Sequence, residues 1–151
     1  MNAPALISGA LGLAACFTDL RHRTIPNWIP AAALLSGLCW HAWSGGWRGA
    51  GLSLLGAASG FAVFLVFYLL GGMGGGDVKL TAGFGALLGP GGLIQAALWI
   101  ALLGGLAAAL VVYWRYWRRR GRAALPGRHE DFIPYAPAIA AGVWITFWVR
   151  S

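Results

Sequence analysis

Hydrophobic residues occur along the chain in six blocks, which are separated by short segments rich in Gly, Pro or charged residues. The blocks cover residues 3–18, 28–43, 50–71, 80–90, 93–114 and 132–149. A helix that crosses a bilayer needs about 20 apolar residues, with a range of roughly 17–25. The third and fifth blocks meet this length, whereas the first, second and sixth are short. The pattern predicts membrane-spanning helices and no β-strands.

The fourth block is too short to span a bilayer alone and is rich in Gly. Together with the fifth block it forms one apolar stretch, 80–114, that is too long for a single span. The cluster Gly89-Pro90-Gly91-Gly92 is the natural place to divide it. We therefore predict an all-α bundle of about six transmembrane helices, which forms one integral-membrane domain over residues 1–151.

Basic residues indicate the orientation of this bundle. With six spans and the N-terminus outside, nine of the eleven Lys and Arg residues fall in cytoplasmic loops, and only Arg48 and Arg150 do not. Cytoplasmic loops typically carry such an excess. Without the fourth span, the Arg-rich segment 115–130 would lie on the opposite side from Arg21 and Arg23. The charges therefore favour six spans with the N-terminus outside.

Composition narrows the class of protein. Hydrophobic residues make up 59% of the chain, charged residues 10%, and the mean hydropathy is +0.70. Soluble domains contain about 25% charged residues, so a typical cytosolic enzyme, a disordered tail and a secreted disulfide scaffold are excluded. We expect the lipid bilayer to be the main surrounding of the protein. The net charge of +7 comes from basic residues in loops beside apolar segments. Such residues typically set the orientation of a membrane protein, so we expect no nucleic-acid partner.

Two further patterns suggest sites that we do not expect to exist. Leu13-Ala14-Ala15-Cys16 resembles a lipoprotein cleavage site, but residues 1–15 contain no Lys or Arg, and a signal peptide needs a basic start. We expect residues 1–18 to be a retained helix. Two cysteines and three histidines are scattered without paired spacing, whereas a structural zinc site needs four ligands at short spacings. We expect no metal and no cofactor.

The acidic residues are few and lie on one side of the membrane. They are Asp19, Asp77, Glu130 and Asp131. All four fall in segments assigned to the cytoplasmic side, although acids contribute little to orientation. Asp19 ends the first expected helix and Asp77 opens the fourth, so two spans return them to the same face. Ionisable groups at a membrane boundary are candidates for function.

Two neighbouring carboxyl groups support a specific chemistry. Repulsion between like charges keeps one of them protonated, so the pair titrates as a unit. The ionised member can activate water, while the protonated member can hydrogen-bond a scissile carbonyl, as in aspartic proteases. Taken singly, Asp19 could be a helix-end acid paired with Arg21 or Arg23, and Asp77 an N-cap. The surrounding motifs favour the paired interpretation.

Each acid lies in a distinctive motif. Asp77 ends the glycine-rich segment Gly74-Gly75-Gly76-Asp77 and is followed by Lys79, while Asp19 precedes Arg21 and the sequence Ile25-Pro26-Asn27. Glycine permits close backbone approach, which a site that binds an extended peptide requires. With Pro134–Gly142 in the last block, these motifs resemble the type IV prepilin peptidases, which are membrane aspartyl proteases with a Gly-x-Gly-Asp motif. The likeness covers residues 10–145.

The resemblance implies an activity and a location. Enzymes of this family remove the basic leader of prepilins at the cytoplasmic face of the bacterial inner membrane, just after a Gly and before the hydrophobic mature helix. The resemblance implies that Asp19 and Asp77 are the catalytic pair. It also suggests site-shaping or substrate-binding positions, which are Gly74, Gly75, Gly76, Lys79, Arg21, Pro26 and Asn27.

The length of the chain resembles the short branch of the family that serves Flp (tight-adherence) pili, so the expected partner is a Flp-type prepilin. Long members carry a cytoplasmic zinc domain between the first two helices and also methylate the new N-terminus. In this sequence only eight residues separate Asp19 from Trp28. The methyltransferase activity is therefore not carried over to this chain.

Three alternatives remain open from the sequence. The same dyad would serve a protease that cuts within the bilayer, as presenilin-like relatives do. A proton-coupled carrier would use Asp19 and Asp77 as relay carboxylates, and would need polar residues deeper in the spans. A scaffold subunit would use the small-residue motifs Gly56-x-x-x-Gly60 and Gly85-x-x-x-Gly89 for helix contacts, which fit packing within this bundle better than packing between chains.

Overall fold

The computed structural model describes residues 3–119 and 135–149, and all regular elements in these ranges are α-helices. The helices are α1 (Ala3–His22), α2 (Trp28–Leu69), α3 (Gly75–Arg119) and α4 (Ala136–Val149). Three of them, α1, α2 and α3, contain stretches long and apolar enough to cross a membrane, whereas α4 is shorter. The expected all-α membrane class is confirmed to this extent.

The six expected helices are observed as four continuous elements in the described residues, because two pairs of hydrophobic blocks are joined. The second and third blocks lie in α2 and the fourth and fifth in α3. Each joined helix contains one glycine with non-helical backbone angles, Gly46 in α2 (φ 56°) and Gly89 in α3 (φ 66°). A positive φ suits glycine, which has no Cβ to clash. One residue therefore changes the direction of the chain where we predicted a loop.

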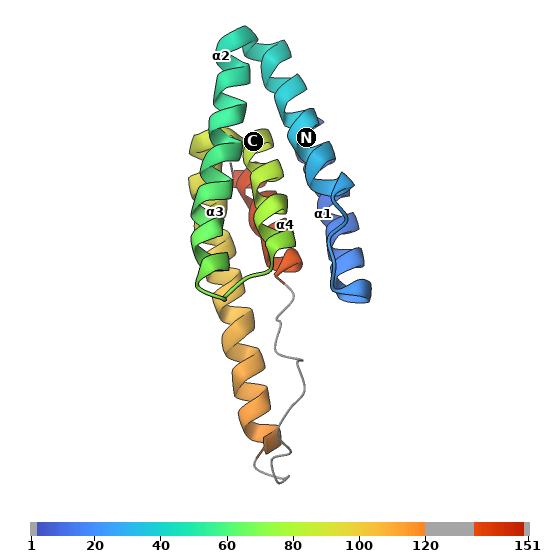
Figure 1. The fold of residues 1–151 in the computed structure, drawn as a ribbon, viewed down its shortest axis with the longest axis vertical. Coiled ribbons are helices and arrows are strands. Elements are labelled where there is room, and N and C mark those ends of the chain that lie inside the picture. The colour runs from blue at the N-terminus through green and yellow to red at the C-terminus, as the bar shows by residue number, and fades with distance from the viewer. Residues whose placement is uncertain (1–2, 120–134, 150–151) are drawn as a thin grey trace.

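The change of direction in α2 is a reversal. A Cβ placed on Gly49 would meet the backbone carbonyl of His41, although residues eight apart in a straight helix are separated by about 12 Å. Figure 1 shows α2 running to the top of the bundle and back, and α3 likewise turning before its long second half descends. The chain thus passes along the bundle axis twice within each of these two elements.

The first half of α3 is the centre of the bundle. Residues 80–89 are almost all buried, and Leu80 and Phe84 have no exposed surface. They pack with Ile29 of α2 and Ile139 of α4, which are equally buried. The sequence marked this segment as a weak span because it is short and rich in Gly. Since protein rather than lipid surrounds it, it needs neither length nor bulky apolar residues.

Glycines bring the backbones of α2 and α3 close together. A Cβ on Gly37 would lie 2.5 Å from the carbonyl carbon of Ala86, and one on Gly56 would lie 2.9 Å from Cα of Gly89. The oxygen of Ser53 adds a buried hydrogen bond to the Ala86 carbonyl (3.0 Å). The two Gly-x-x-x-Gly motifs therefore pack against each other within this chain, as membrane helices with small residues commonly do.

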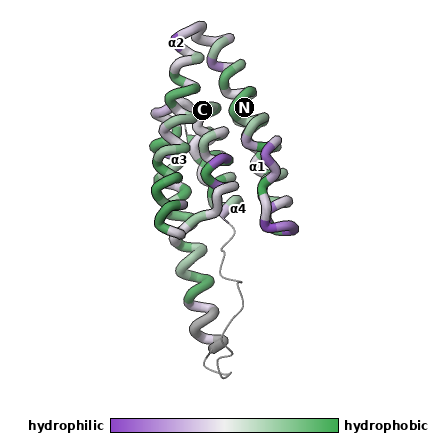
Figure 2. Tube along the Cα trace, in the orientation of Figure 1, coloured by the Kyte–Doolittle hydropathy of each residue, from purple (hydrophilic) through white to green (hydrophobic). Residues whose placement is uncertain are grey.

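Large apolar side chains cover the outside of the bundle. Leu13 is 75% exposed and Trp47 94% exposed, and hydrophobic residues colour most of the helices in Figure 2. Hydrophilic residues gather instead at the end of α1 and in the loop that follows it. This distribution suits contact with lipid along the helices and with water at that end.

Candidate active site

Asp77 is held in the first turn of α3 by the start of its own helix. Its N–H donates to the carbonyl of Gly74 (3.1 Å), and its carboxyl group interacts in return with the backbone amide of Gly74. An acid at the third helical position that reaches back to the N-cap amide forms half of a capping box. Asp77 is only 8% exposed, and its Oδ1 is buried without a hydrogen-bond partner among the described residues. The capping role therefore uses part of the carboxyl group and leaves Oδ1 available.

Asp19 lies in the last turn of α1 and is oriented by a different helix. Its carboxyl group interacts with the backbone amide of Ala136, the first residue of α4, and with the charge of Arg23. The N-terminus of a helix presents free N–H groups and a partial positive charge, both of which stabilise a carboxylate. The Oδ2 of Asp19 is buried and has no hydrogen-bond partner in the described part of the chain.

The two carboxyl groups come together at one end of the bundle. The end of α1, the loop before α3 and the start of α4 lie at the same level in Figure 1. Asp19 and Asp77 are close enough to interact electrostatically, yet no hydrogen bond joins the two groups. Each acid thus has one buried oxygen without a partner, Oδ2 of Asp19 and Oδ1 of Asp77. This arrangement can bind a water molecule or a polar group of a substrate.

The glycine segment before Asp77 makes room for close contacts. The nearest neighbour of Gly76 is the side chain of Ile25, and a Cβ on Gly76 would lie 3.3 Å from it. Gly75 faces the ring of Tyr68 at 3.5 Å by the same measure, and Gly74 faces Oδ2 of Asp77 at 3.3 Å. Of the three glycines, Gly74 faces the acid itself.

A hydrogen bond joins the two sequence motifs. Nζ of Lys79 donates to Oδ1 of Asn27 (3.1 Å). Asn27 occupies the N-cap position of α2, but its side chain caps no backbone group of that helix. The carbonyl of Pro26 accepts the N–H of Ile29 (3.1 Å), which fixes the same turn. The loop that follows Asp19 and the helix that starts beside Asp77 are therefore tied together.

Arg21 contacts Phe17 and is not the cation that interacts with Asp19. Its guanidinium group lies over the ring of Phe17, 5.7 Å from the ring centroid, and Arg21 is exposed. The cation that interacts with Asp19 is Arg23. Glu130, Asp131 and most of the Arg-rich segment 115–130 lie outside the described residues.

Comparison with known proteins shows the family of this chain. The model of the type IV leader peptidase family matches residues 6–112, which include both acids and the glycine segment. The chain belongs to the type IV leader peptidase family. No solved structure matches the chain significantly.

Relatives of this leader peptidase family member come from several bacteria. The chain is 35% identical to a "Prepilin leader peptidase/N-methyltransferase" of Bacillus subtilis over 150 residues, which are 92% of this chain and 52% of the relative. Proteins of the same name from Burkholderia pseudomallei and Xanthomonas campestris are 34% and 30% identical, over 86% of this chain and 41% and 44% of their own lengths. The chain therefore spans about half the length of these curated relatives.

One group at the candidate site was not assigned from the sequence. The Ala136 amide lies in the Pro-rich signature where α4 begins, and a proline near a helix start could have indicated an exposed helix N-terminus there. Arg23, which the sequence offered as an alternative to Arg21, directly follows α1 and has a positive φ of 52°. Among the described residues, no group of three or more His, Cys, Asp or Glu side chains could hold a metal ion.

Proposed function

We propose that this chain is a membrane aspartic endopeptidase that removes the leader peptide from type IV prepilins. The observation that carries the proposal is the pair Asp19 and Asp77, whose carboxyl groups lie together at one end of the bundle, each with a buried oxygen that lacks a partner. Family membership and the names of the relatives support the choice of a prepilin as substrate. The methyltransferase activity in those names is not part of the proposal.

The proposed reaction uses the two acids in different protonation states. The ionised carboxylate takes a proton from a water molecule bound between the unpartnered oxygens, and the water oxygen attacks the scissile carbonyl carbon. The protonated carboxyl group hydrogen-bonds the carbonyl oxygen of the peptide bond. The carboxyl group that took the proton from water then donates it to the leaving nitrogen, and the C–N bond breaks. Both products leave without a covalent intermediate.

The surrounding residues have supporting roles in this proposal. Gly74, Gly75 and Gly76 leave space for an extended peptide beside Asp77. The Lys79–Asn27 hydrogen bond, together with the Pro26 turn, holds the two acid-bearing segments in register. Arg21 is exposed beside Phe17, where it can contact the phosphate groups of lipids.

We further propose that residues 1–151 form one domain in the bacterial inner membrane, with the acids at its cytoplasmic face. The reversals at Gly46 and Gly89 support separate crossings by the two halves of α2 and of α3, which makes six crossings with the N-terminus outside. The excess of Lys and Arg in the loops on the side of the acids supports this orientation. The shortness of the Asp19–Trp28 segment supports a Flp-type prepilin as substrate.

A proton-coupled carrier finds little support. Such a carrier needs polar side chains free to relay protons along the spans. The buried hydroxyl groups of the described residues donate instead to backbone carbonyls nearby: Ser8 to Ala5, Ser53 to Ala86, Thr81 to Asp77 and Thr146 to Gly142.

The test is cleavage of a Flp-type prepilin in membranes that contain the wild type, Asp19→Asn or Asp77→Asn. These changes keep size and remove the carboxylate, so we expect each to lower the cleavage rate by about 10²–10⁴-fold. The matched controls are Glu130→Gln and Asp131→Asn, which remove the other two acids and should cleave like the wild type. Cleavage at the wild-type rate by both Asp19→Asn and Asp77→Asn would refute the dyad, and no cleavage by the wild type would refute the substrate.

A further inference from the structure

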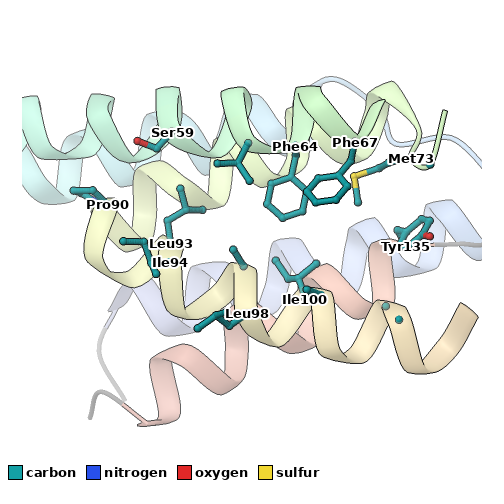
Figure 3. A pocket seen from close by; sticks show the side chains of 16 residues that line it. Ser59, Phe64, Phe67, Met73, Pro90, Leu93, Ile94, Leu98, Ile100 and Tyr135 are labelled. Carbon is teal, nitrogen blue, oxygen red and sulfur yellow. The ribbon is translucent and has the colours of Figure 1, made fainter. Parts of the chain in front are cut away.

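An apolar groove of about 600 Å³ opens between the second halves of α2 and α3, and its side chains are shown in Figure 3. None of its lining residues is charged. On α3 the lining runs from Pro90 to Gly105, which corresponds to about 22 Å along a helix axis. The volume is in the range of ligand pockets, and the length is a large part of the hydrocarbon thickness of a bilayer.

One end of the groove reaches the candidate active site. Met73 and Tyr135 lie at this end, whereas Ser59 and Pro90 lie at the other (Figure 3). Met73 directly precedes Gly74, whose amide interacts with Asp77. Tyr135 directly precedes Ala136, whose amide interacts with Asp19. The groove is therefore continuous with the backbone segments that hold both acids.

The wall formed by α3 carries small residues as well as large apolar side chains such as Leu93 and Ile100. Ala97, Ala101 and Gly105 line it, and a Cβ added to Gly105 would meet no atom within 4 Å. The opposite wall carries Phe64 and Phe67 of α2, whose rings lie 6.0 Å apart. The groove thus has large apolar side chains on both walls, and the small residues on α3 let a second helix approach closely where they lie.

We infer that this groove binds the apolar segment of the substrate that follows the cleaved bond. The inference rests on the proposed function, because the occupant must be continuous with a peptide held between Asp19 and Asp77. A substrate with a basic leader and an apolar continuation matches a site with two acids followed by an uncharged groove. A peptide that leaves the acids past Met73 and Tyr135 enters this groove directly, and its apolar side chains replace lipid there.

Disulfide crosslinking tests the location of the segment. The enzyme carries Cys16→Ala and Cys39→Ala, which remove the native cysteines, and Asp77→Asn, which leaves the substrate uncut. Ala97→Cys or Ala101→Cys is then combined with a Flp-type prepilin that has one cysteine in its apolar segment. The matched control is Ala62→Cys, because Ala62 is exposed on α2 but does not line the groove. We expect crosslinks at residues 97 and 101 and only background at residue 62.

A steric variant gives a second, independent readout in the active enzyme. Ala101→Trp fills the groove, so we expect the rate of prepilin cleavage to fall by about 10–100-fold, as positioning defects do, while Ala62→Trp cleaves like the wild type. Both variants are compared for membrane level and unfolding temperature in detergent. If Ala101→Trp does not accumulate, the crosslinks decide, because cysteine is close to alanine in size.

The outcomes separate this inference from the proposed function. Absence of prepilin cleavage by the cysteine-containing wild type would overturn the proposed function and this inference with it. Normal cleavage with crosslinks no stronger at residues 97 and 101 than at residue 62 would overturn the groove alone. That result would assign the groove to a lipid acyl chain.

Discussion

Replacement of Gly56 by Ala should weaken the contact between α2 and α3. The added Cβ would lie 2.9 Å from Cα of Gly89 and 3.0 Å from the carbonyl carbon of Gly85, and closer still to the Gly85 oxygen. Carbon atoms in contact are normally about 3.5–4.0 Å apart, so the two backbones must separate by roughly 1 Å. No flexible side chain is present to absorb the change, because both neighbours are glycines.

Gly51→Ala is the matched control for this change. Gly51 lies in the same half of α2, and a Cβ added there meets no atom within 4 Å. Both substitutions gain the helix propensity of Ala over Gly, about 0.8–1 kcal/mol. The difference between the two variants therefore isolates the overpacking, for which we expect about 1–3 kcal/mol in the free energy of unfolding.

The assay is equilibrium unfolding in detergent micelles, followed by helix content and by Trp fluorescence. We expect Gly51→Ala to be as stable as the wild type or slightly more stable, and Gly56→Ala to be less stable by the margin above. Equal stabilities for the two variants would show that α2 and α3 are not in backbone contact at Gly56. The account of how these helices pack would then be refuted.

Two further predictions concern the residues around the acids. Lys79→Met and Asn27→Ala should each reduce the rate of prepilin cleavage, and the double variant should lose less than the sum of the two losses. The exposed Lys79–Asn27 hydrogen bond corresponds to a coupling of about 0.5–1 kcal/mol in a double-mutant cycle of cleavage rates. Additive losses would contradict this hydrogen bond. Ala136→Pro removes the N–H that interacts with Asp19 at a helix position where proline is tolerated. Because Ala136 has no exposed surface, the larger ring also disturbs packing, so the matched control is Ala136→Val, which enlarges the side chain and keeps the N–H. We expect cleavage by Ala136→Pro to be about tenfold slower than by Ala136→Val, corresponding to about 1.4 kcal/mol. Equal cleavage by the two variants would show that this amide does not orient Asp19.

Much of the candidate site could be predicted from the sequence because its residues are rare in their surroundings. Four acids in a chain of 151 residues stand out against an apolar background. Asp19 lies before a motif typical of a helix start, and Asp77 lies at the end of a glycine motif. The structure places Asp19 in the last turn of α1 and Asp77 in the first turn of α3. Local signals of this kind depend on few neighbouring residues and can be identified from the sequence without knowledge of the tertiary structure.

Tertiary contacts account for what the sequence did not predict. The hydrophobic pattern separates α2 and α3 into four blocks. In each of these two elements, a single glycine with a positive φ reverses the direction of the backbone without a loop. The segment 80–90 was the weakest predicted span because it is short and rich in Gly, whereas the structure buries almost all of it. Length and bulky apolar residues suit a helix to lipid, and a helix enclosed by other helices needs neither. The choice of Arg23 over Arg21 as the neighbour of Asp19 depends on the backbone at the end of α1, which no pattern specifies.

The interaction of Asp19 with the first amide of α4 has a consequence for the order of biosynthesis. The ribosome makes α1 and α3, which carry the two acids, before it makes α4. Asp19 therefore receives its orienting amide only when α4 has entered the bundle, and the nascent chain holds both acids in the membrane in an unassembled geometry until then. If the proposed function holds, cleavage therefore becomes possible only after α4 has inserted.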